Sequence, residues 1–229
     1  MSVSILYYKV SQERISSAQL SEQIADWVEE IPEIKQQQVK RLRQQSDQVL
    51  SLAGLQLLKI GISELSGIPF SLAQLQFPAS SKPFIEGNID FNISHSGDVV
   101  CCVISDSDKV GIDLELQRDV TPATMNKYLN ETADTLKDSA EENKKQLFFD
   151  IWTKNEAIIK AANRGSIYNM LDIKHEKGAS HYQNEFWYTY PVDIVPADDN
   201  NEYTCHIACS EPVDSHAIKQ LTAKQIHNL

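Results

Sequence analysis

Positive charge is scarce in this sequence, because 21 lysine and arginine residues stand against 32 aspartate and glutamate residues and leave a formal net charge of −11. Neutralising the phosphates of a nucleic acid requires clustered basic side chains. The charge balance therefore argues against a nucleic-acid partner and against binding to an anionic membrane surface. One basic segment occurs, from Lys35 to Arg43, and it is either a local site for a small polyanion or a solvated helix face.

Long apolar runs are also missing. The longest internal run, Val99–Ile104, is far shorter than the roughly 20 residues that a transmembrane helix needs. The N-terminal segment has no basic leader and its apolar stretch is short, so no targeting signal is evident. We therefore expect a cytoplasmic protein that does not associate with a membrane.

Cysteine is sparse, with four residues in segments whose composition is typical of strands. Cys101 and Cys102 are adjacent, and adjacent strand residues point to opposite faces, so these two do not form a metal pair. Cys205, His206 and Cys209 superficially suggest zinc, but no second pair of ligands follows at a zinc spacing. We interpret all four cysteines as structural residues.

Hydrophobic periodicity predicts a similar series of elements in each half of the chain. In the first half it predicts a strand over 5–9, a helix over 20–31, a basic helical stretch and a helix over about 47–65. A β-like piece over 74–77 and a hairpin of strands 89–93 and 99–104 follow. In the second half it predicts a strand over 110–116, a helix-rich stretch over 121–142, a long helix over 144–163, and strands over 186–190 and 203–210. The tail over 211–229 fits either a strand or a helix.

This series predicts an α+β fold in which two similar halves, related by a pseudo-twofold, each carry a small antiparallel sheet packed on one long helix. The polar segment 106–108 separates the two series, so we place an N-terminal half at 1–107 and a C-terminal half at 108–229. Since one chain would supply both sides of the cleft between such halves, we expect a monomer.

Two acidic residues share one face of the predicted strand over 110–116. The strand period of two places Asp113 and Glu115 on the face opposite Ile112 and Leu114. Like charges at that separation repel unless a cation or a proton lies between them, and hard oxygen ligands suit Mg²⁺. The alternative is the solvent-facing side of an ordinary amphipathic strand.

A second group of chemically active residues lies on the long helix of the second half. Trp152, Glu156 and Lys160 follow one another at intervals of four, so they share one stripe of that helix. The alternative is an exposed Glu-to-Lys pair that stabilises the helix by a few tenths of a kcal/mol.

A third element is the turn Asn92-Ile93-Ser94-His95-Ser96-Gly97, where a strand ends. Its hydroxyls, imidazole and backbone donors can together cradle a phosphate. The alternative is a plain hairpin turn in which Ser94 and His95 cap their own backbone.

Taken together, these elements resemble the surfactin-type, two-domain 4'-phosphopantetheinyl transferases. The resemblance rests on NISHSG at 92–97, GIDLE at 111–115 and W-x-x-x-E-x-x-x-K at 152–160, with the weaker Ser81-Lys82-Pro83 upstream. It implies the pseudo-twofold fold of that family. It also implies transfer of the phosphopantetheine group from coenzyme A to a serine of an apo acyl or peptidyl carrier protein, with release of 3',5'-adenosine bisphosphate.

The resemblance further implies roles for the matching residues. Asp113, Glu115 and Glu156 would hold Mg²⁺ against the pyrophosphate of coenzyme A, and Glu156 would also be the base for the carrier serine. Lys160 would face the pyrophosphate and neutralise charge during the transfer.

The coenzyme A contacts implied by the resemblance lie mainly in the first half. Ser94 and His95 would contact the 3'-phosphate, with Lys82 nearby. The family also presents basic residues from its first-half helices, and Lys35, Lys40 or Arg41 are the candidates here, in an uncertain register.

The sequence departs from the family pattern at three positions. Asn155 stands where the family usually has a lysine before the helix glutamate, and Lys154 cannot replace it because a helix turns about 100° per residue. Ser81 replaces a glycine, and Leu50 falls at the position of a family arginine. Two rival hypotheses therefore remain: a catalytically degenerate member that binds coenzyme A or a carrier protein, and a non-enzymatic interaction protein.

Overall fold

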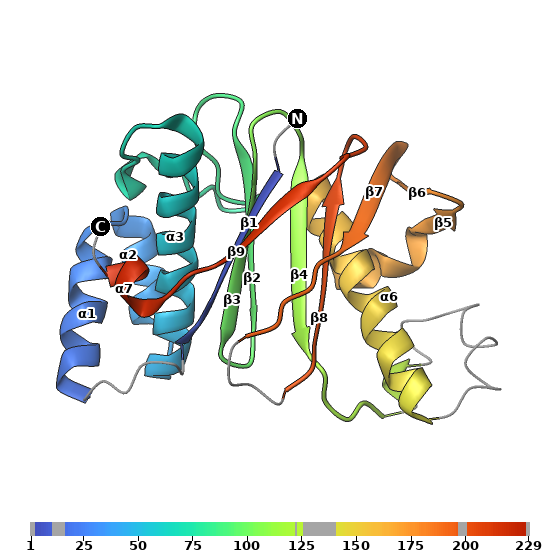
Figure 1. The fold of residues 1–229 in the computed structure, drawn as a ribbon, viewed down its shortest axis with the longest axis horizontal. Helices are drawn as coiled ribbons and strands as arrows, with labels where there is room; N and C mark the ends of the chain where they lie inside the picture. The colour runs from blue at the N-terminus through green and yellow to red at the C-terminus, as the bar shows by residue number, and fades with distance from the viewer. Residues whose placement is uncertain (1–2, 11–16, 122, 126–140, 197–200, 228–229) are drawn as a thin grey trace.

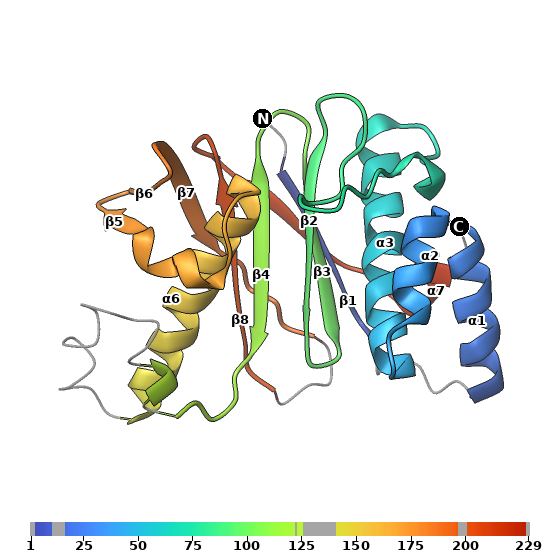
Figure 2. The same ribbon diagram turned by 180° about the vertical axis from the view of Figure 1, so that it is seen from behind.

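The computed structural model describes residues 3–10, 17–121, 123–125, 141–196 and 201–227. Within these residues the chain forms two sheets that pack face to face, with helices on both outer sides (Figures 1 and 2). The predicted α+β class is confirmed, with one long helix packed against each sheet.

The first sheet has the order β2-β3-β1-β9. Its strands are β1 (Val3–Lys9), β2 (Asp90–Ser96), β3 (Val99–Ser105) and β9 (His216–Gln220). Neighbours are antiparallel except β9, which runs parallel to β1. The helices α1 (Ser17–Glu29), α2 (Glu33–Lys40) and α3 (Gln45–Ser66) cover its outer face, as Figure 1 shows, with the short α7 (Ala223–His227) beside them.

The second sheet has the order β4-β8-β7-β6-β5 and is antiparallel throughout. Its strands are β4 (Val110–Leu116), β5 (Lys174–Glu176), β6 (Ala179–Tyr182), β7 (Glu185–Pro191) and β8 (Tyr203–Cys209). The long helix α6 (Glu141–Ala162) packs along β4 and β8 on the outer face, and a 3-10 helix over Ile167–Asp172 follows it.

Side chains from both sheets form the core between them. Val3, Ile5 and Cys101 of the first sheet join Ile112 and Ile207 of the second in one buried cluster. A separate cluster fills the space between the first sheet and its helices, and it includes Cys102, so the adjacent cysteines do face opposite sides of β3.

The helix α3 is long and apolar enough to cross a membrane by composition alone, but two thirds of its most apolar window, 67%, is buried inside the protein. It is the core helix that was predicted over about 47–65. Buried core helices of soluble domains commonly reach this hydropathy, so α3 carries no argument for a membrane.

Most of the predicted elements are confirmed, and a few are wrong. The segment 74–77 is a 3-10 turn over Leu72–Gln74 followed by a single bridge between Gln76 and Phe84, not a strand. The sequence did not predict β5 or β6. The tail forms a strand and then a helix, and most of the predicted helical stretch over 121–142 lies outside the described residues.

The division at residue 107 stays a prediction. It assigns all of 108–229 to the C-terminal half, whereas β9 pairs with β1 in the first sheet.

Candidate active site

The helix α6 lies unusually close to β4 because of Gly111. A β-carbon at this position would collide with the backbone of α6 at Ala157 and Ala161. Glycine therefore allows the helix to settle directly on the strand. This contact brings the side chains of α6 into reach of the acidic face of β4.

The predicted two faces of β4 are confirmed. Ile112 and Leu114 are buried in the core between the sheets. Asp113 and Glu115 lie on the other face and line a pocket of about 370 Å³ together with Glu156 and Lys160 of α6. His95 of β2 also lines this pocket, so both halves contribute to it. We call it the acidic pocket.

A compact set of polar contacts fixes Asp113. The ammonium nitrogen of Lys160 lies 2.6 Å from Oδ1 of Asp113 and 3.2 Å from Oγ of Ser94. The Ser94 hydroxyl donates to the same Asp113 oxygen at 3.1 Å. The carboxylate and ammonium are thus held together at the junction of β2, β4 and α6.

Burial raises the pKa values of all three acids in the pocket. Asp113 is buried, and this raises its pKa despite the lowering effect of Lys160. Burial and then the charge of Asp113 raise the pKa of Glu115. Burial, reinforced by the charges of both other acids, also raises the pKa of Glu156.

Lys160 stays protonated in this setting. Burial lowers the pKa of its ammonium group, but the charge of Asp113, the hydrogen bond to Asp113 and the charge of Glu156 together outweigh that effect, and the net pKa is raised. One fixed positive charge therefore faces three carboxylates.

The chemistry of this pocket fits a divalent cation. The three carboxylates and one ammonium have a formal charge of −3 + 1 = −2. Oδ2 of Asp113 is buried and has no hydrogen-bond partner, which is costly for a carboxylate oxygen unless a cation meets it. Across the described residues, no three His, Cys, Asp or Glu side chains are grouped closely enough to be ready-made ligands. The side chains of Asp113, Glu115 and Glu156 would therefore have to move closer together to bind one ion.

A second pocket, of about 220 Å³, adjoins the acidic pocket and shares Ile93 and His95 with it. Lys35 of α2 lies in its wall, with the ammonium nitrogen 5.8 Å from the centre of the Phe77 ring. Burial lowers the pKa of Lys35. Partial burial and the charge of Lys160 lower the pKa of His95, although that residue keeps contact with solvent. We call this the apolar-basic pocket.

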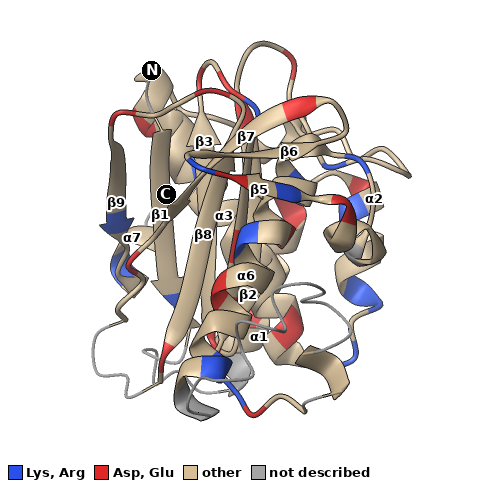
Figure 3. Ribbon diagram, turned by 90° about the vertical axis from the view of Figure 1, so that its right-hand side faces the viewer, with Lys and Arg blue, Asp and Glu red and all other residues tan. Residues whose placement is uncertain are grey.

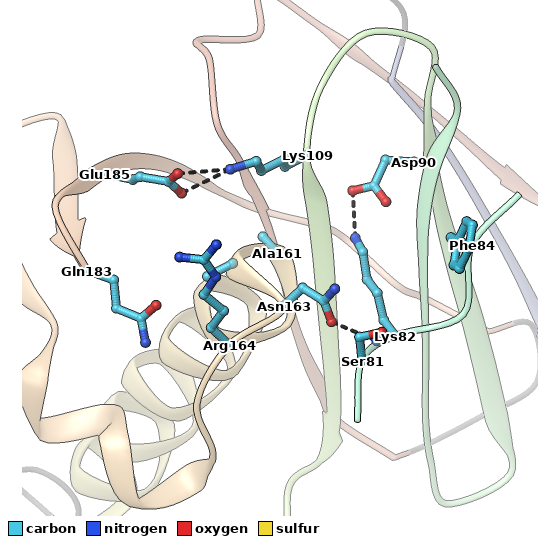
Figure 4. Close-up of a pocket in the computed structure, with 11 residues that line it drawn as sticks. Ser81, Lys82, Phe84, Asp90, Lys109, Ala161, Asn163, Arg164, Gln183 and Glu185 are labelled. Carbon is cyan, nitrogen blue, oxygen red and sulfur yellow. Dashed lines mark hydrogen bonds and ion pairs between the residues drawn. The ribbon is translucent and has the colours of Figure 1, made fainter. Parts of the chain in front are cut away.

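Two other predicted basic residues lie elsewhere. Lys82 lines a third pocket, shown in Figure 4, where its ammonium nitrogen contacts Asp90 at 2.5 Å and the carbonyl oxygen of Val110 at 3.0 Å. Lys40 is exposed at the end of α2, a helix that carries basic positions, coloured blue in Figure 3. A phosphate contact by Lys82, Lys40 or Ser94 stays a prediction.

Position 206 carries a contact that the sequence did not reveal. His206 of β8 is buried, and its Nδ1 lies 2.8 Å from Oγ1 of Thr153 on α6. His206 faces the helix, whereas Cys205 and Cys209 face the core between the sheets, so the suspected zinc residues point in opposite directions. The register of β8 against β4 places His206 opposite Asp113.

Comparison with known proteins gives consistent matches along the chain. The model described as "4'-phosphopantetheinyl transferase, N-terminal" matches residues 18–107, and the model described as "4'-phosphopantetheinyl transferase superfamily" matches residues 109–206. The 4'-phosphopantetheinyl transferase gsp of Aneurinibacillus migulanus is 28% identical over 202 residues, which is 85% of this chain and 83% of that protein.

Two further relatives match less of the chain. A putative 4'-phosphopantetheinyl transferase of Haemophilus influenzae is 28% identical over 68% of this chain and 68% of that protein. The 4'-phosphopantetheinyl transferase AcpT of Salmonella typhi is 32% identical over 53% of this chain and 62% of that protein.

Proposed function

Because this chain belongs to the 4'-phosphopantetheinyl transferase superfamily, we propose that it transfers the phosphopantetheine group of coenzyme A to a serine of an apo acyl or peptidyl carrier protein. The reaction releases 3',5'-adenosine bisphosphate and depends on Mg²⁺. The observation that supports this proposal best is that Asp113, Glu115, Glu156 and Lys160 line one pocket between the two halves.

The two adjoining pockets suit the two ends of the nucleotide part of coenzyme A. In the apolar-basic pocket, Phe77 and Leu55 offer an apolar surface for adenine, and Lys35 offers a positive charge for the 3'-phosphate. His95 lines both pockets, and one nitrogen of its imidazole would donate a hydrogen bond to a phosphate oxygen of the coenzyme. The pyrophosphate then reaches the acidic pocket.

Asp113, Glu115 and Glu156 would hold the Mg²⁺ ion. When bound, Mg²⁺ would supply electrostatic stabilisation of the phosphoryl oxygens on which charge develops. The unpartnered Oδ2 of Asp113 and the negative charge of the pocket support this assignment.

The transfer itself is a displacement at the β-phosphorus of coenzyme A. The carrier serine oxygen forms the new bond to phosphorus as the bond to 3',5'-adenosine bisphosphate breaks. Glu156 takes the proton of the serine hydroxyl, directly or through water. Lys160 neutralises the negative charge that develops on the phosphoryl oxygens.

Lys160 is the lysine that lines the acidic pocket among the described residues. Asn155, at the position of the usual family lysine, is buried, and its Oδ1 has no hydrogen-bond partner. Leu50 is buried in the core of the first half, so it contributes nothing to coenzyme binding. Since one chain supplies both walls of the acidic pocket, the proposed enzyme works as a monomer.

Mass spectrometry of a carrier protein tests the proposal directly. Incubation of the purified protein with coenzyme A, Mg²⁺ and an apo carrier protein should add one phosphopantetheine mass to the carrier, and a chelator should prevent the addition. A carrier whose acceptor serine is replaced by alanine is the control. No addition to fatty-acid, polyketide or peptide carriers, together with calorimetric binding of coenzyme A, would favour the degenerate, non-catalytic alternative.

A further inference from the structure

The strands β2 and β4 lie side by side as the edge strands of two different sheets, and side chains join them. Four alternate residues of β2 each accept a hydrogen bond from a backbone N–H of β4. The acceptors are Asp90 from Val110 at 2.8 Å, Asn92 from Ile112 at 3.0 Å, Ser94 from Leu114 at 3.3 Å and Ser96 from Leu116 at 3.0 Å. We call this set the side-chain ladder.

The repeat of a β-strand explains why four consecutive contacts are possible. Alternate side chains on one face of a strand recur about every 6.6 Å, and so do the N–H groups along one edge of a strand. Two strands that run in the same direction therefore stay in step. Lys82 and Lys160 complete the edge by donating to the carbonyl oxygens of Val110 and Ile112.

The two serines of the ladder have a second contact that Asp90 and Asn92 do not share. The Ser94 hydroxyl donates to Oδ1 of Asp113, and the Ser96 hydroxyl donates to Oε2 of Glu115, each at 3.1 Å. Each serine thus accepts from a β4 amide and donates to the carboxylate of the residue just before that amide. The geometry repeats from one serine to the next.

We propose that Ser96 is a positioning residue: anchored by the Leu116 amide, its hydroxyl turns the Glu115 carboxylate into the acidic pocket. This inference rests on the proposed function, because it assigns Glu115 to the cation that the pocket would hold. The alternating polar residues of NISHS thus connect the halves and also orient the acids. Ser94 has the same relation to Asp113, but Lys160 already restrains that carboxylate, so Ser96 gives the cleaner test.

The test compares Ser96→Ala with Ser96→Thr, which keeps a hydroxyl, and with Asn92→Ala, which removes one contact of the ladder without touching an acid. Because Asn92 also lines the apolar-basic pocket, the Mg²⁺ comparison is made at saturating coenzyme A. Amide hydrogen exchange of the metal-free protein measures the ladder itself. The Mg²⁺ concentration that gives half of the thermal stabilisation, at saturating coenzyme A, measures the positioning of Glu115. The kcat and KM values for transfer are measured in parallel.

We expect faster exchange of the Leu116 amide in Ser96→Ala and of the Ile112 amide in Asn92→Ala. The half-stabilising Mg²⁺ concentration should rise about tenfold in Ser96→Ala, the scale typical of residues that orient metal ligands. It should be close to the wild-type value in Ser96→Thr and Asn92→Ala. The kcat of Ser96→Ala should fall at low Mg²⁺ and recover at high Mg²⁺, with little change in the KM for coenzyme A.

Three outcomes would overturn the proposal. An unchanged Mg²⁺ requirement in Ser96→Ala, in a wild-type protein that transfers and responds to Mg²⁺, refutes the positioning role alone. An equal rise in Asn92→Ala reduces Ser96 to a structural contact. A wild-type protein that neither transfers nor responds to Mg²⁺ refutes the proposed function and this inference together.

Discussion

The two long helices occupy equivalent places in the two halves, yet their buried faces differ in kind. Toward the first sheet, α3 presents apolar residues and glycines, and Gln56 is its one buried polar residue. Toward the second sheet, α6 presents the buried Thr153 and the half-buried Glu156 and Lys160 among its apolar residues. Each helix stabilises a sheet, but α6 also brings charge next to the core.

This difference shows how a repeated architecture can divide its tasks. A buried charge is costly unless it is paired and hydrogen-bonded, so each such group reduces the margin of stability. The first half avoids that cost with an apolar helix and its packing. The second half carries this cost, because the charged side chains of α6 line the acidic pocket. Substitutions at matching places in the two helices should make this division measurable.

The largest expected contrast is catalytic. We expect Glu156→Ala to reduce the rate of carrier modification about 10³-fold, because it removes the proposed cation ligand and the proposed base in one step. The matched substitution on α3 is Glu64→Ala, at an exposed residue whose carboxylate pairs with Lys219. The initial rate of the mass shift measures both. Rates that differ by less than tenfold between the two variants would disprove the assignment of Glu156.

The second contrast concerns one lysine ion pair on each long helix, that of Lys160 with Asp113 on α6 and that of Lys59 with Glu30 on α3. Lys160→Met should lower the free energy of unfolding by about 3 kcal/mol, because it leaves Asp113 buried without its partner. Lys59→Met on α3 should cost less than about 1 kcal/mol, since Glu30 is 35% exposed and can be solvated. Urea denaturation measures both, and similar losses would mean that the two pairs are equivalent.

The third contrast concerns the glycines at which each helix meets its sheet. Gly111→Ala should lower the free energy of unfolding by about 3 kcal/mol, because the new methyl group would collide with the rigid backbone of α6. Gly61→Ala on α3 should lower the free energy of unfolding by less than about 1 kcal/mol, since the new methyl group meets only the side-chain ends of Ile104 and Leu6 and alanine favours the helix. Thermal unfolding compares them. A larger loss for Gly61→Ala would show that α3 is the more rigidly seated helix.

The smallest contrast is a pH effect. Burial lowers the pKa of His206 in the folded protein, so the unfolded state, with its ordinary value near 6.5, binds protons first as the pH falls. The stability contributed by neutral His206 is therefore complete above about pH 6.5 and is lost below it.

Thermal unfolding at pH 7 and pH 5 measures that effect. His206→Gln should remove about 1 kcal/mol of the acid destabilisation relative to the wild type. The control is His95→Gln in the first half, which should remove less because His95 keeps contact with solvent. If His206→Gln left the pH dependence unchanged, His206 would bind its proton equally well in the folded and unfolded states, which would contradict the lowered pKa.

The sequence predicted those parts of the site that depend on local periodicity. The alternation from Val110 to Leu116 predicts which face of β4 is acidic, and the interval of four predicts that Glu156 and Lys160 share a stripe. These periods follow from the geometry of one strand or one helix. The structure accordingly places these residues in one pocket.

Contacts between distant elements could not be predicted in this way. Nothing local indicates that the Lys160 ammonium pairs with Asp113, or that His206 meets Thr153. The ladder did leave a signal, the polar alternation from Asp90 to Ser96, but an exposed strand face would show the same pattern. Short elements were missed for a related reason, since Lys174–Glu176 is exposed throughout and has no hydrophobic alternation.

The position of β9 has a consequence for synthesis on the ribosome. Leu221 and Ile226 follow this strand and are buried in the core under α1 and α3. Until those residues leave the exit tunnel, β1 has an open edge and the core beside it lacks two of its side chains. The half of the molecule that is translated first is therefore the half that is completed last.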